Sequence, residues 1–195
     1  MQNVLPLNYF GSIRYFQELL RPQSVIDIHE HYIKQTGRSR CEILSANGRI
    51  HLSVPVSKPH GSKTIIKDVE VSYNTDWQRV HWRAIESAYA SSAFFDDYAF
   101  DIERLIFSGQ KTLMGLDLAS IQLVNSWLDL ELDYHCSENF LEGLNINDLR
   151  NVELDSTSTP RYYQLFSSSD NFESGLSILD LIFSEGPMAR KWLIL

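Results

Sequence analysis

The sequence predicts a mixed α/β fold of the α+β kind. Its N-terminal half is β-rich with one early helix, and its C-terminal half is mostly helical. Between residues 40 and 71 apolar and polar residues alternate, which is the period of strands with one buried face. From Asp76 onward apolar residues recur every three or four positions, which is the helical period. With 195 residues, the chain fits one domain spanning 1–195.

The first expected elements are a short strand, a helix and a second short strand. We expect a strand at residues 1–5 and a helix at residues 9–20, where apolar residues fall on one helical face. Pro22 ends this helix because proline cannot continue the helical hydrogen bonds. Residues 24–28 are β-branched and predict the second strand.

A β-hairpin with its turn at Asn47-Gly48 follows. Asn-Gly between two strand-like runs is a strong hairpin signal because both residues tolerate a positive φ. The flanking strands are residues 40–46 and 49–56, and Pro55, which lacks an N–H, indicates a sheet edge. Residues 64–71 also alternate and predict a further strand.

Helices dominate the remaining chain. Asp76 is expected to cap a helix that runs to about Ala90, because its carboxylate can accept hydrogen bonds from the first N–H groups. Residues rich in Ser, Thr and Pro between 155 and 170 predict exposed loops around a short strand or extended segment at 161–166. The other predicted elements are helices at 94–107 and 117–130, a strand at 132–136, and short helices at 144–150, 176–183 and 187–192.

The composition excludes several classes of protein. Lys and Arg number 17 and Asp and Glu number 25, so the net charge of −8 argues against a general nucleic-acid binder. The N-terminus lacks a secretory signal, and no apolar run approaches the roughly 18–20 residues of a membrane span. Two cysteines outside any Cys-x-x-Cys unit fit reduced thiols, and we expect a cytoplasmic protein.

The densest group of functional side chains lies in the helix predicted from Asp76. Arg79 and Arg83 are one turn apart, so both can emerge on one side and bind a carboxylate or phosphate. Alternatively, the charged residues form a solvated face while the aromatic residues are core. The ligand-binding candidates here are Trp77, Gln78, Arg79, Trp82, Arg83, Glu86 and Tyr89, and His81 is a candidate proton carrier.

A second polar group lies at residues 29–41, after a predicted strand, where loops often carry sites. His29 and His31 could share one face, but no third residue at metal-ligand spacing follows, and we predict no metal site. His31 is instead a candidate general base because imidazole titrates near neutral pH. Gln35 and Arg40 are further ligand-binding candidates.

Cys41 and Asp180 each allow two interpretations. Cys41 could be a nucleophile paired with His29 or His31, or a small buried residue at the start of a strand, which we favour. Asp180 lies among apolar neighbours, so we expect an Arg, His or backbone N–H partner. It is a ligand-binding candidate, although its segment also fits a cap that seals the core. Gly-x-Ser-x-Gly, Walker and Gly-x-Gly-x-x-Gly motifs are absent.

Several blocks together resemble the WbqC-like family of bacterial proteins. The most specific is Trp77-Gln78-Arg79-Val80-His81-Trp82-Arg83; the others are Tyr9-Phe10, Tyr15-Phe16, Lys34 to Cys41, Ser53-Val54-Pro55-Val56, Ala88-Tyr89, Phe94-Phe95, Leu176 to Asp180 and Glu185-Gly186-Pro187. Members often accompany genes for surface-polysaccharide (O-antigen) assembly. Many members begin with His-Gln-Pro-x-Tyr-x-Pro-Trp, whereas this chain has Leu5 in place of the His and Gly11-Ser12 in place of the Pro-Trp pair.

The resemblance implies a cytoplasmic bacterial protein that acts on a sugar- or nucleotide-linked intermediate by group transfer. In that case a cleft would join the loop at 29–41 to the helix at 77–89, and His29 or His31 would replace the family's early His. A non-catalytic module that binds a ligand or partner of the same pathway is the main alternative, and nucleotidyl transfer is a third. The sequence indicates no particular cofactor and no oligomeric state.

Overall fold

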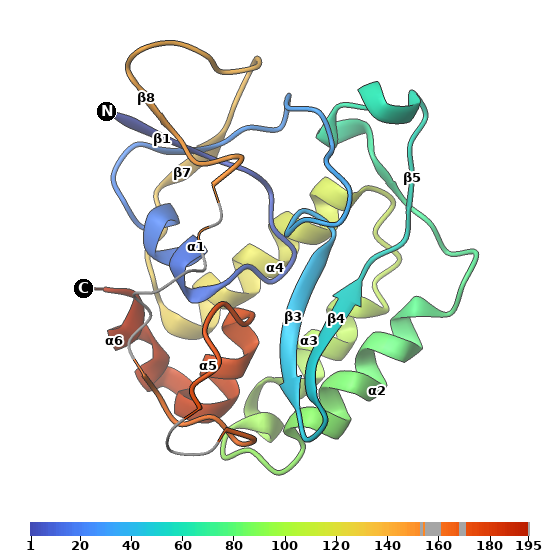
Figure 1. The fold of residues 1–195 in the computed structure, drawn as a ribbon, viewed down its shortest axis with the longest axis vertical. Coiled ribbons are helices and arrows are strands. Elements are labelled where there is room, and N and C mark those ends of the chain that lie inside the picture. The colour runs from blue at the N-terminus through green and yellow to red at the C-terminus, as the bar shows by residue number, and fades with distance from the viewer. Residues whose placement is uncertain (153, 155–160, 168–170, 195) are drawn as a thin grey trace.

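A computed structural model describes residues 1–152, 154, 161–167 and 171–194, and it has the predicted mixed α/β architecture. Its main sheet is wholly parallel, which the sequence did not specify. The sheet has the order β7-β2-β1-β8, formed by β1 (Gln2–Leu5), β2 (Ser24–Ile26), β7 (Tyr134–Cys136) and β8 (Ile146–Asp148). A hairpin and a group of helices lie beside this sheet (Figure 1).

The first helix is shorter than expected because the chain makes a loop before it. α1 (Ile13–Leu19) begins after Ser12, whose side chain accepts a hydrogen bond from the Tyr15 N–H. Residues 6–12 leave β1 without helical structure, and Phe10 has a positive φ of 43°. Together β1, α1 and β2 form a parallel strand–helix–strand unit.

The predicted hairpin is confirmed, although its turn lies one residue earlier than expected. In the hairpin, β3 (Arg40–Ser45) pairs antiparallel with β4 (Gly48–Ser53), and Ser45 faces Gly48. The two loop residues are therefore 46 and 47, and of the Asn-Gly pair only Gly48 has a positive φ, at 98°. β5 (Val56–Ser57) then pairs antiparallel with β6 (Glu70–Val71).

The expected long strand at 64–71 is wrong. The middle of this segment is the 3₁₀ turn η2 (Ile66–Asp68), its last two residues form the short strand β6, and η1 (Gly61–Lys63) precedes it. Ile66 and Val69, three residues apart, are both buried, whereas a regular strand would place them on opposite faces. The Ile66 N–H donates to the Glu30 carbonyl, which draws the segment toward residues 28–31.

The remaining helices are α2 (Trp77–Tyr89), α3 (Phe95–Ile106), α4 (Leu113–Leu128), α5 (Ile178–Glu185) and α6 (Arg190–Leu193), with η3 (Gly186–Ala189) between the last two. α2 packs on β3 and β4, and α1 packs on α6. Contrary to expectation, the Asp76 carboxylate caps no N–H group of α2 and forms an ion pair with Arg79 instead. α4 begins a turn earlier than predicted because Thr112 caps it.

The predicted short helix at 144–150 is also wrong, since this segment contains the edge strand β8. It pairs with β1, with Gln2 beside Ile146 and Val4 beside Asp148, and the backbone groups on that side of β1 thereby gain partners. Residues 161–166 form no strand, and 155–160 and 168–170 lie outside the described residues. None of the described helices is long and apolar enough to cross a membrane.

Candidate functional site

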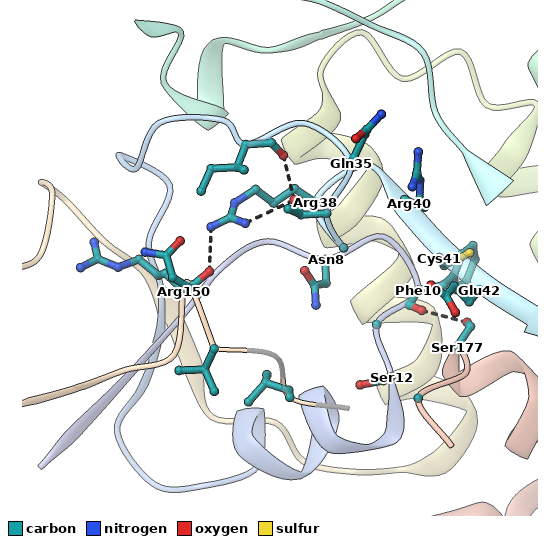
Figure 2. Close-up of a pocket in the computed structure, with 18 residues that line it drawn as sticks. Asn8, Phe10, Ser12, Gln35, Arg38, Arg40, Cys41, Glu42, Arg150 and Ser177 are labelled. Carbon is teal, nitrogen blue, oxygen red and sulfur yellow. Dashed lines mark hydrogen bonds between the residues drawn. The ribbon is translucent and has the colours of Figure 1, made fainter. Parts of the chain in front are cut away.

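A pocket of about 400 Å³ lies where three loops meet (Figure 2). The first loop is 8–12, between β1 and α1, and the second is 33–38, which leads toward β3, whose first residues 40–42 also line the pocket. The third segment follows β8 and contributes residues 150–152 and 154, and residues 175 and 177 before α5 complete the wall. Most of the non-glycine lining residues are polar, with amide, hydroxyl or guanidinium groups.

The pocket lies at the carboxyl end of the parallel sheet. Asn8 follows the end of β1 and Arg150 follows the end of β8, and these two strands are neighbours. From β1 the sheet extends in both directions, with β2 and β7 on one side and β8 on the other. In open parallel sheets, ligands bind outside the carboxyl ends of the strands where the strand order diverges in this way.

Two of the loops are joined directly. The Tyr9 N–H donates to the Gly37 carbonyl at 2.9 Å. A Cβ atom on Gly37 would lie 2.6 Å from Asn8 Oδ1, so only glycine allows this approach without displacing the Asn8 amide. That amide points into the space between the loops (Figure 2) and has no hydrogen-bond partner among the described residues. It is therefore available to a ligand.

Two non-glycine residues of the pocket lining have left-handed backbone conformations. Phe10 has a φ of 43° and Gln35 a φ of 61°. Phe10 is held on both sides, because its N–H donates to Ser120 Oγ and its carbonyl accepts from Ser177 Oγ. Conformations of this kind cost about 1–3 kcal/mol and cluster at functional sites.

Arg38 forms a buried wall of the pocket. Its Nε donates to Glu30 Oε1 at 2.8 Å and its Nη2 to Glu30 Oε2, a bidentate ion pair. Its other bonds run to Thr36 Oγ1 and to the Arg150 carbonyl, as Figure 2 shows. Burial raises the pKa of Glu30, while the hydrogen bond from Arg38 acts in the opposite direction.

Arg150 is held in place by acidic residues at the strand ends. Its guanidinium contacts Asp27 and Asp148 and donates to the Leu141 carbonyl at 2.8 Å. The Phe140 ring lies 4.4 Å from the guanidinium carbon. The hydrogen bond from Arg150 lowers the pKa of Asp148. In Figure 2 this guanidinium points away from Asn8, so Arg150 shapes the pocket largely through its backbone.

A chain of hydrogen-bonded side chains runs from Asp27 through Ser137 and His29 to Lys67. Ser137 Oγ lies 2.8 Å from Asp27 Oδ1 and 3.2 Å from His29 Nδ1, while His29 Nε2 lies 2.9 Å from Lys67 Nζ. Because the Lys67 ammonium can only donate, His29 Nε2 accepts and its Nδ1–H donates to Ser137. Both ring nitrogens of His29 are thus used within the protein, and His29 lies outside the pocket lining.

Arg40 is bound least tightly of the pocket arginines. Its Nε donates to Ser53 Oγ at 2.9 Å, and its terminal nitrogens have no partner within the described part of the chain. The neighbouring Glu42, which also lines the pocket, contacts Arg49 at 2.8 Å and His51 Nδ1 at 3.2 Å. The Arg40 guanidinium can therefore bind a ligand without breaking an ion pair of the fold.

Ser12 and Ser177 of the lining cap helices, and the Cys41 thiol is buried. Ser12 caps α1, and Ser177 Oγ caps α5 while donating to the Phe10 carbonyl at 2.8 Å. Burial raises the pKa of the Cys41 thiol, so this side chain stays neutral. Cys41 and Cys136 are both free, and Cys41 is buried at the start of β3, as favoured from the sequence.

The structure separates the candidates on α2 into two faces. Trp77, His81 and Tyr89 are buried, whereas Arg79, Arg83 and Glu86 are exposed. Gln78 and Trp82 are partly buried; Gln78 donates to the Ile106 carbonyl, and Trp82 stacks on Phe95. The lining of the pocket includes no residue of α2, whereas it includes Gln35 and Arg40 from the loop candidates.

His81 uses both ring nitrogens inside the protein. Its Nε2 lies 3.1 Å from the Ser53 carbonyl, which can only accept, so Nε2 carries the hydrogen. Nδ1 therefore accepts from the Tyr9 hydroxyl at 3.4 Å. His81 has only 2% of its surface exposed, and this burial lowers its pKa to about 4. This neutral imidazole links α2, β4 and the loop after β1.

Two other candidates contact each other in the core. Tyr89 and Tyr162 donate to the two carboxylate oxygens of Asp180 at 2.8 and 2.7 Å, and Gln164 adds an amide hydrogen bond. The expected Arg, His or backbone partner of Asp180 is thus replaced by two phenols and an amide.

His31 is exposed and only its backbone bridges to Ile65. Across the described residues no cluster of three His, Cys, Asp or Glu could hold a metal.

The sequence as a whole places the chain among known proteins. The WbqC-like protein family matches residues 7–154. The chain belongs to this family. It is also similar to "Uncharacterized protein Rv1507c" of Mycobacterium tuberculosis, with 26% identity over an alignment that covers 95% of this chain and 91% of the relative. No solved structure matches the chain.

The segment that resembles the family's early motif borders the pocket. Residues 5–12 resemble the His-Gln-Pro-x-Tyr-x-Pro-Trp pattern, and Asn8, Phe10, Gly11 and Ser12 among them line the pocket. Leu5, in place of the His, is fully buried in β1, and neither His29 nor His31 lines the pocket. The sequence patterns do not single out Asn8, Arg38, Arg150 or Asn151, although the departure of residues 5–12 from the motif marks the segment that contains Asn8.

Proposed function

We propose that this WbqC-like protein binds a sugar-linked intermediate of bacterial surface-polysaccharide assembly in the pocket and supports transfer of a group to or from it. The observation that carries this proposal is the position of the Asn8 amide. It follows β1 at the point where β8 is added to the sheet, lacks a protein partner among the described residues, and points into the pocket.

The lining suits a carbohydrate chemically. Asn8, Gln35 and Asn151 each offer an amide that can donate and accept, as sugar hydroxyl groups require. Val152 and Leu154 supply an apolar surface for the C–H groups of a sugar ring. The association of the family with surface-polysaccharide genes supports the same class of ligand.

The second candidate function is a non-catalytic module that binds such a ligand for another protein of the pathway. It is favoured by the state of the nucleophilic groups, since Ser12 and Ser177 serve as caps and the Cys41 thiol is neutral. If group transfer occurs, we therefore expect it to run directly between two bound molecules rather than through a covalent adduct with these residues.

Four probes test the proposal: methyl β-D-glucoside, methyl β-D-glucuronide, glucose 1-phosphate and UDP-glucose. Binding is measured by saturation-transfer NMR and thermal shift for the native protein and for Gly37→Ala, whose added Cβ displaces the Asn8 amide. We expect at least one probe to bind and Gly37→Ala to weaken it. The control is Ser87→Ala on the exposed face of α2, outside the pocket lining.

The same probes separate the two functions. A probe recovered intact by mass spectrometry after long incubation with a suitable acceptor, while still bound in the pocket, favours the binding module. A product of altered mass that disappears with Gly37→Ala favours group transfer. If no probe binds, or if Gly37→Ala binds as well as the native protein, the pocket is not a sugar site.

A further inference from the structure

We infer that the ligand of this pocket carries a single carboxylate and that Arg40 binds it. The inference rests on the proposed function of the pocket as a sugar site, and it narrows the ligand to a sugar acid. The hydrogen-bond donors of Arg38, Arg150 and the start of α5 already bind groups of the protein, whereas those of Arg40 are largely uncommitted among the described residues.

Arg38 has almost no donor to spare. Of the five N–H groups of its guanidinium, Nε and one on Nη2 bind Glu30, the other on Nη2 binds the Arg150 carbonyl, and one on Nη1 binds Thr36. Its charge is matched by Glu30 at a site where Arg38 is only 3% exposed. Turning Arg38 toward a ligand would leave a buried carboxylate without its partner, which is costly.

Arg150 is occupied in the same way. Its Nε and Nη2 bind Asp148, its Nη1 binds Asp27, and Nη2 also donates to the Leu141 carbonyl. Two carboxylates therefore face one guanidinium, so this corner of the pocket carries no surplus of positive charge. An anionic ligand gains little from it.

The N-terminus of α5, which lies at the pocket wall, has no free N–H groups to bind a phosphate among residues 178–180. At the start of α5, the Ile178 N–H donates to the Gly11 carbonyl, the Leu179 N–H to Ser177 Oγ, and the Asp180 N–H to the Ser177 carbonyl. Phosphate binding at a helix N-terminus needs such N–H groups to be free. A phosphorylated or diphosphate-linked ligand therefore finds no backbone cradle here.

Arg40 remains as the donor for an acid group. One of its five N–H groups binds Ser53, and the two terminal nitrogens are uncommitted within the residues described. A planar fork with one positive charge matches a planar carboxylate with one negative charge. Arg38 and Arg150 are paired with carboxylates, so a second negative charge on the ligand would find no uncommitted cation among the described lining residues.

The test compares methyl β-D-glucuronide with methyl β-D-glucoside, which differ only in having a carboxylate in place of a hydroxymethyl group, and with glucose 1-phosphate. Affinities are measured by NMR titration for the native protein, Arg40→Gln, Arg40→Lys and the control Arg83→Gln on the exposed face of α2. Circular dichroism checks that each variant is folded.

We expect the native protein to prefer the glucuronide over the glucoside by about tenfold, the scale of one charge-assisted hydrogen bond. Arg40→Gln should remove the preference, Arg40→Lys should keep part of it because the fork is lost but the charge remains, and Arg83→Gln should keep all of it. Tighter binding of glucose 1-phosphate, or an unchanged preference in Arg40→Gln, overturns the inference. Equal binding of both glycosides overturns it but leaves the sugar site intact, whereas binding of no probe overturns both.

Discussion

The Tyr89 hydroxyl lies 2.8 Å from Asp180 Oδ1 and joins α2 to α5 inside the core. The same hydroxyl accepts the Leu44 N–H, so it also fixes β3. The aromatic and acidic residues that make α2 and α5 conspicuous in the sequence are thus joined to each other. Their arrangement explains how the helices are fastened to the hairpin.

Tyr89→Phe is expected to destabilise the protein by about 1–3 kcal/mol, because it removes a donor from a buried carboxylate. Tyr163→Phe is the matched control, since Tyr163 is 67% exposed, and its effect should be below about 0.5 kcal/mol. Urea unfolding monitored by circular dichroism measures both. Equal effects of the two substitutions would contradict the role given to Tyr89.

Arg38→Gln and Arg79→Gln should differ strongly. Arg38→Gln leaves Glu30 buried without its cation, which costs about 3–5 kcal/mol. Arg79 pairs only with Asp76, and both side chains are largely exposed, so Arg79→Gln should cost at most about 0.5 kcal/mol. The free energy of unfolding at pH 7 decides between a structural role for Arg38 and a role confined to the pocket surface.

His81 should make the fold sensitive to acid. Its pKa is lowered by burial to about 4, below the value of 6.5 for an exposed imidazole, so the unfolded chain binds a proton first as the pH falls. The stability due to neutral His81 is complete above pH 6.5 and is lost between 6.5 and about 4, up to about 3 kcal/mol.

Unfolding measured between pH 4 and 7.5 for native protein, His81→Gln and the exposed control His135→Gln tests this expectation. The slope of stability against pH should be shallower in His81→Gln and unchanged in His135→Gln. A native slope in His81→Gln would mean that other groups cause the acid sensitivity.

Asp117 should have the opposite dependence on pH. Both its carboxylate oxygens are buried without a hydrogen-bond partner among the described residues, and burial raises its pKa well above 3.8. The folded state therefore holds a proton that the unfolded chain releases, and stability declines as the pH rises from 3.8 toward the raised pKa. Asp117→Asn should be more stable than the native protein at pH 7, with the gain vanishing near pH 3.8. An equal gain at both pH values would contradict this account.

Local patterns predicted much of the fold. The hairpin, α2 and α3 depend on turn residues and on a clear period, both of which are visible in short stretches of sequence. β8 was predicted as a helix because it becomes a strand only by pairing with β1, far away in the chain. The same long-range pairing makes the sheet parallel.

The pocket was only partly visible for the same reason. The polar loop at 29–41 indicates Gln35 and Arg40, whereas Asn8 and Asn151 are far apart in the sequence and both border the pocket because β8 adds beside β1. On α2, Trp77, His81 and Tyr89 are spaced by four and eight residues, so they share a helical face, and that face packs into the core. The residue types on α2 suggest a ligand site, but the burial of Trp77, His81 and Tyr89 shows that they pack in the core.

The most direct test of the account is to locate the bound ligand. ¹H–¹⁵N spectra of the protein titrated with methyl β-D-glucuronide, methyl β-D-glucoside and glucose 1-phosphate report which backbone amides shift. For whichever probe binds, the account predicts that the largest shifts fall on Asn8, Gly11, Gly37, Arg40 and Gly175, while the exposed residues Arg79, Arg83 and Glu86 of α2 stay unchanged. Shifts concentrated on the exposed face of α2, with the pocket amides unmoved, would contradict it.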